Sequence, residues 1–113
     1  MPDQKAVKKE QRKLARIFAG IDANQLVVVA GLIERAAFLR VSLAELESEI
    51  ANEGYTEEYQ NGENQHGVKQ SAAVMTYNAM LKNYMAIIDK LTKLTPAAVE
   101  KSKLSEFLRP GTQ

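Results

Sequence analysis

Six basic side chains lie within the first sixteen residues of the 113-residue sequence, at spacings that suit one side of a helix. They are Lys5, Lys8, Lys9, Arg12, Lys13 and Arg16. At about 3.6 residues per turn, most of these positions share one face. Lysines and arginines clustered on one face neutralise phosphates, so this segment is the first candidate for contact with DNA. A solvated amphipathic helix is the alternative explanation of the same pattern.

A second and weaker basic group lies further along the chain and comprises Lys69, Lys82, Lys90 and Lys93. Two tyrosines, Tyr55 and Tyr59, precede it in a polar stretch. A tyrosine ring can stack on a base or fill an interface, and packing is the commoner use. This group is therefore the second choice for DNA contact.

Side chains for catalysis or metal binding are sparse. The single histidine, His66, has no second ligand at zinc-site spacing, and the sequence has no cysteine. Glu45 and Glu49 lie one helical turn apart and suit a divalent ion, although a solvated acidic face explains them better. No phosphate-binding glycine loop and no nucleophile–base pair is evident. The sequence therefore predicts a protein that is not an enzyme and uses no metal and no cofactor.

The net charge is only +1, but it is unevenly distributed: +4 over residues 1–20, −6 over residues 34–63 and +4 over residues 64–113. Basic ends of this kind can meet an anion. The length suits one domain. Charged side chains interrupt the most apolar run, residues 26–46, so we expect no membrane span, and the first ten residues lack the apolar stretch of a signal peptide.

The periodicity predicts a single all-α domain that positions these side chains on four helices. A basic N-terminal helix precedes a long central helix, a polar loop without periodicity, a second long helix and a short C-terminal helix opened by Thr95-Pro96. The expected ranges are 1–20, 22–53, 54–70, 71–94 and 95–108.

Several helix ends carry recognisable capping residues. Gly20 and Gly54 suit helix stops, and Ser71 suits the N-cap of the second long helix. Asp22 with Gln25 three residues later has the form of a capping box, which predicts that Asp22 caps the long central helix.

The central helix is apolar almost all round in its first half, and three short helices of one chain would hardly bury it. We therefore expect this helix to contact other copies of the chain, with Arg40 paired to a glutamate of a neighbour. The second long helix has an unbroken a/d stripe from Val74 to Leu91, which predicts antiparallel pairing with the central helix. The candidate interface residues are Leu26, Val29, Ile33, Ala37, Arg40, Tyr77 and Tyr84.

Taken together, several stretches resemble the small subunits of terminases encoded by phages and prophages of Gram-positive bacteria. The resemblance lies in their order: a long helix, an Asn/Gly-rich link, a tyrosine-rich helix and a last helix begun by Thr-Pro. It covers roughly residues 8–108. The matching stretches are residues 31–43 (GLIERAAFLRVSL), 59–71 (YQNGENQHGVKQS), 77–78 (YN), 82–84 (KNY) and 94–98 (LTPAA).

This resemblance implies a ring-shaped homo-oligomer that recognises the packaging site on viral DNA. It also implies a large terminase subunit as partner, which holds the ATPase and nuclease and is recruited and regulated by the small one. The expected location is the cytoplasm of the infected bacterial host, with no membrane contact. One departure is that Ala72 follows Ser71, where family members often have proline; alanine is a good helix former, so the assignment is little affected.

Three other functions fit parts of the pattern. A helix-turn-helix regulator would use Gly20-Ile21-Asp22 as its turn, but the apolar residues 26–30 that follow cannot read base edges. An oligomeric adaptor without nucleic acid would show no salt-sensitive DNA binding. An enzyme would need the acidic helix to bind a metal ion.

Overall fold

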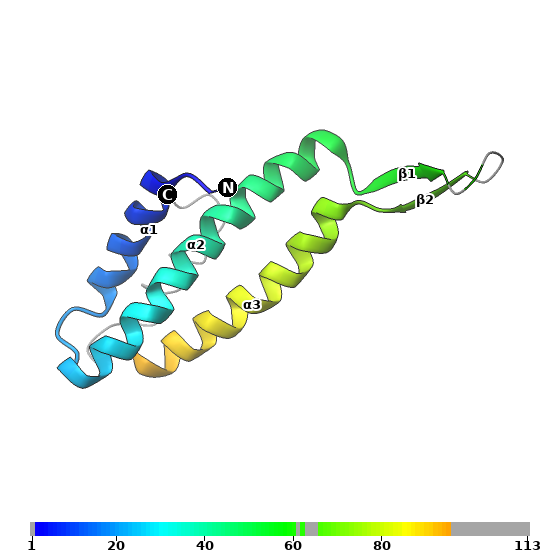
Figure 1. The fold of residues 1–113 in the computed structure, drawn as a ribbon. Helices are drawn as coiled ribbons and strands as arrows, with labels where there is room; N and C mark the ends of the chain where they lie inside the picture. Colours follow the sequence, from blue (N-terminus) through cyan, green and yellow to red (C-terminus); the bar gives the residue numbers. More distant parts are fainter. Residues whose placement is uncertain (1, 61, 63–65, 96–113) are drawn as a thin grey trace.

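A computed structural model describes residues 2–60, 62 and 66–95 of the chain. Three helices form a bundle: α1 (Gln4–Ile17), α2 (Ala23–Glu53) and α3 (Ala72–Leu94). Between α2 and α3 the chain forms an antiparallel hairpin of β1 (Thr56–Gln60) and β2 (His66–Gln70). Figure 1 shows α3 running back along α2, α1 packed beside α2, and the hairpin projecting beyond the end of the helices. The result is an elongated molecule of 63 × 24 × 23 Å.

The mainly helical fold and the pairing of the two long helices are confirmed. The polar loop predicted over residues 54–70 is wrong, because most of that stretch is the β1–β2 hairpin. Every residue of β1 is exposed, and so is all of β2 except the half-buried Gly67. Without a buried face, the two strands lack the apolar alternation that marks a strand in a sequence. The predicted C-terminal helix, residues 95–108, lies outside the described residues except for Thr95.

The helix ends follow local capping chemistry in most places. Asp3 accepts a hydrogen bond from the backbone N of Lys5 at 3.1 Å, and the Ser71 Oγ accepts one from the backbone N of Val74 at 3.1 Å. Gly54 ends α2 with φ +87° and ψ −176°, a conformation open almost only to glycine. The capping box was a wrong prediction: Asp22 occupies the N-cap of α2, but its side chain makes no capping hydrogen bond.

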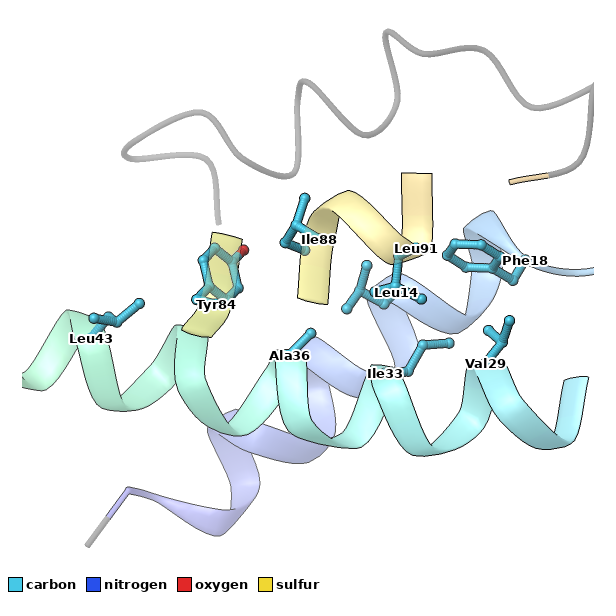
Figure 2. Close-up of a cluster of buried hydrophobic side chains, with 9 residues drawn as sticks. All are labelled: Leu14, Phe18, Val29, Ile33, Ala36, Leu43, Tyr84, Ile88 and Leu91. Carbon is cyan, nitrogen blue, oxygen red and sulfur yellow. The ribbon is translucent and has the colours of Figure 1, made fainter. Parts of the chain in front are cut away.

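The core lies where all three helices meet (Figure 2). Helix α1 contributes Leu14, and the residue at its C-cap is Phe18; they are 0% and 1% exposed. From α2 and α3 the buried members are Val29, Ile33, Ala36, Leu43, Tyr84, Ile88 and Leu91. Because α2 packs against α1 on one side and α3 on another, two faces of α2 are apolar, and this accounts for its lack of a single stripe.

Candidate nucleic-acid interface

The basic residues of α1 lie on the side of the helix that faces away from the core. Val7, Leu14 and Phe18 are buried against the rest of the bundle. At about 100° per residue, the six basic positions fall in an arc of about 140° centred opposite these three. Five of the six side chains are exposed and Lys13 is half-buried. The structure therefore brings together the whole first group of predicted DNA-binding residues: Lys5, Lys8, Lys9, Arg12, Lys13 and Arg16.

No carboxylate lies on this basic face of α1. Between Gln4 and Ile17 the only acidic residue is Glu10, and its side chain is on the inner side of the helix, 8% exposed. Asp3, the other acid near this helix, lies at its N-cap. Apart from Lys13, which is half-buried and has a partner, the exposed cations of the face have no acidic residue beside them on the helix. An excess of positive charge on one side of a helix attracts a polyanion.

Two sets of contacts fix α1 on the bundle. Leu14 and Phe18 anchor it in the core, and the backbone N of Asp3 donates to Oε2 of Glu45 on α2 at 3.2 Å. A basic helix held by its inner side presents its charges in one fixed orientation. Its rigidity reduces the ordering cost when a ligand binds.

A polar cluster inside the bundle joins all three helices. Burial raises the pKa of Tyr84 on α3 to about 12, while the charge of Arg40 on α2 acts in the opposite direction and that of Glu10 on α1 raises it further. Arg40, predicted to pair with a neighbouring subunit, is half-buried and interacts within its own chain. Glu10, for which the sequence predicted no role, belongs to this cluster.

The second basic group is split between the hairpin and α3. The Nζ of Lys69 on β2 lies 3.4 Å from Oε1 of Glu57 and 6.0 Å from the centre of the Tyr59 ring. On α3, Lys93 pairs with Asp89 at 3.1 Å, while Lys82 and Lys90 are exposed. Because two of these four lysines already have carboxylate partners, this group is a weaker anion site than α1.

The predicted interface residues have different surroundings. Val29, Ile33, Ala37 and Tyr84 are already buried within a single copy of the chain, so they need no neighbouring copy to cover them. Tyr77 is half-buried, and its hydroxyl donates to Oε2 of Glu47 on α2 at 3.0 Å. Of this set only Leu26 is largely exposed, at 48%.

Leu26 belongs to an apolar surface that the sequence analysis did not single out. Its neighbours Val27 and Val28 are 77% and 60% exposed, and Phe38, further along α2, is 40% exposed. We call these four residues the apolar flank of α2. Val27 and Phe38 are eleven residues apart, about three turns, so they lie on nearly the same side of α2. The exposed apolar residues on this side of α2 are the signal that the sequence analysis missed.

A shallow groove of about 250 Å³ between α1 and α2 joins the two surfaces. It is bordered by Arg12 of the basic face and by Leu26 of the apolar flank, with Phe18 and Ile33 among its lining residues. The basic and apolar surfaces of the molecule therefore meet at this groove.

The described part of the chain offers few groups for catalysis. Over residues 2–60, 62 and 66–95 there is no place where three or more histidine, aspartate or glutamate side chains gather closely enough to hold a metal ion. The carboxylate of Glu45, considered for such a site, accepts the hydrogen bond from Asp3. No helix among the described residues is long and apolar enough to cross a membrane.

No protein-family model matches the sequence, and comparisons with curated proteins and with solved structures give no match.

Proposed function

We propose that this chain is the DNA-recognition small subunit of a phage terminase and acts as a homo-oligomer. The observation that carries the proposal is the basic face of α1, with six cations opposite the buried side and no acid among them. The family resemblance of residues 8–108 supports it, since it supplies a role for a basic helix on a helical bundle. In this role the face contacts the phosphates of the packaging site.

Self-association is the second part of the proposal, and the apolar flank of α2 supports it. Leu26, Val27, Val28 and Phe38 remain exposed after the chain has folded. Large apolar side chains left exposed on a folded chain commonly mark a surface that another protein covers. In an assembly with rotational symmetry, the basic face would be repeated once per copy, and the combined charge would strengthen DNA binding.

The large terminase subunit, which supplies the ATPase and nuclease, is the proposed partner in packaging. A small subunit of this kind selects the DNA and recruits the large one, so it needs binding surfaces and no catalytic groups. A helix-turn-helix regulator is a poorer account, because the start of α2 presents Val27 and Val28 where a reading helix needs polar side chains.

The direct test compares two triple variants in DNA binding. K9Q/R12Q/R16Q removes three charges from the basic face of α1, and K82Q/K90Q/K93Q removes three charges from α3. Fluorescence anisotropy with duplex DNA over a salt series gives affinity and its salt dependence. Each lost phosphate contact lowers the slope of log K against log salt by about 1, so we expect the α1 variant to lower it by up to about 3.

The α3 variant should retain most of the slope of the unmodified protein. Equal losses in the two variants would contradict a DNA site on α1. Absence of any salt-sensitive binding by the unmodified protein would contradict the nucleic-acid role itself and favour an adaptor.

A further inference from the structure

The β1–β2 hairpin stands apart from the bundle and buries almost nothing of itself (Figure 1). All residues of the two strands are exposed except Gly67, which is half-buried. Among them are two large apolar or aromatic side chains, Tyr59 at 43% and Val68 at 66% exposure. An isolated two-stranded hairpin is marginally stable in water, and its two outer edges present unpaired backbone groups that invite another strand.

Contacts within the hairpin set its register and define its two faces. Glu57 pairs with Lys69, and Tyr59 pairs with Gly67, on one face. The Tyr59 ring lies over Gly67 so closely that a Cβ there would come within 2.6 Å of the ring. On the other face Glu58 lies opposite Val68. A strand that continues this register would meet an ordered ladder of side chains at either edge.

The two edges of the hairpin differ in charge. Glu57 and Glu58 lie on β1, whereas Lys69 is the charged residue of β2. Pairing two β1 edges places glutamates against glutamates, and pairing two β2 edges places lysine near lysine. Like charges directly opposite each other destabilise a sheet, and opposite charges stabilise it. Charge therefore favours β2 of one copy against β1 of another.

We propose that the hairpins of neighbouring copies join edge to edge, β2 of one copy against β1 of the next, as one continuous antiparallel sheet. The proposal rests on the self-association in the proposed function and names a second contact for it, separate from the apolar flank of α2. In this arrangement Lys69 lies between its own Glu57 and a glutamate of the next copy. Because the contact joins two different edges, it can repeat around a closed ring.

Disulfide trapping tests this pairing cleanly, since the chain has no cysteine. Glu58→Cys and Val68→Cys are made as separate single variants with different tags, then co-expressed and oxidised. Val68 and Glu58 occupy the same rung and face in one hairpin, so an in-register sheet also brings Val68 of one copy near Glu58 of the next. A disulfide needs Cβ atoms about 3.5–4.5 Å apart, so we expect about tenfold more linked pairs in the mixture than in either variant alone.

Glu57→Cys with Lys69→Cys repeats the test on the other face, and Ala19→Cys, an exposed position after α1, is the control for random collisions. Circular dichroism and light scattering verify that each variant folds and assembles. Linkage of Glu58→Cys to itself as efficient as in the mixture would overturn the β2-to-β1 pairing. An assembled protein without linkage on either face would also overturn it and leave the proposed function standing, whereas a monomeric protein would overturn both.

Discussion

Tyr84 illustrates how one side chain can make the stability of the bundle depend on pH. Its side chain is 4% exposed, and burial raises its pKa from 10.0 to about 12. Above pH 10 the unfolded chain loses the phenol proton while the folded chain keeps it, so the unfolded state binds fewer protons. We therefore predict that this residue makes the free energy of unfolding fall as pH rises from about 10 to about 12.

Urea unfolding of the unmodified protein and of Tyr84→Phe at several pH values measures this effect. Tyr84→Phe removes the titrating group and keeps the ring, so its stability should decline less over that interval. Parallel declines in the two proteins would show that other groups, such as the lysines, account for the whole pH dependence.

Burial also predicts unequal effects for two apolar side chains of α3. Leu91 is 0% exposed and Met85 is 63% exposed. Leu91→Ala leaves a cavity in the core and should lower the free energy of unfolding by about 2–5 kcal/mol. Met85→Ala, the matched control, should change it by less than about 0.5 kcal/mol. Thermal or urea unfolding compares the two, and similar losses would argue against the packing of α3 on α2 described above.

For individual residues, the exposure of a side chain was the feature that the sequence predicted least well. The six cations of α1 were recognisable because helical spacing alone gathers them. Val29 and Val28 are neighbours of the same type in one apolar stretch, yet one is 0% and the other 60% exposed. Only the directions from which α1 and α3 pack decide between them, and those directions are not written in the local sequence.

At the level of elements, two glycines of α2 lead to opposite predictions. Gly31 lies inside the helix, and an added Cβ would be 3.5 Å from the flexible Arg35 Nη1, an ordinary contact. Gly31→Ala should therefore stabilise the protein by up to about 1 kcal/mol. Gly54→Ala places a Cβ where φ is +87° and ψ −176° and should cost about 1–3 kcal/mol. Circular dichroism during thermal unfolding checks the signs, and a stabilising Gly54→Ala would contradict the observed helix end.

The helices were predictable as elements because their period and several of their caps are local signals. Ser71 and Gly54 act as expected, whereas Asp22 does not cap with its side chain. The hairpin was missed because period-two alternation requires one buried face, and neither of the two strands has one. One signal was present: Asn61-Gly62, a dipeptide typical of tight hairpin turns, lies between the two strands.

For the whole molecule, charge and apolar surface are arranged along one elongated body. Helix α1, which carries the basic face, lies beside α2 as far as Glu45, and the groove lined by Arg12 and Leu26 joins this face to the apolar flank. The hairpin, with Glu57 and Glu58 on β1, lies beyond the far end of α2 (Figure 1). The proposed function assigns DNA to the basic surface and further copies of the chain to the apolar and edge-strand surfaces.

The mass of the purified protein in solution tests the central claim most directly. Light scattering or native mass spectrometry at micromolar concentration measures it without any modification of the chain. The proposed function predicts a discrete assembly of many copies, held by the apolar flank of α2. A stable monomer or dimer over that range would contradict a ring-forming terminase small subunit.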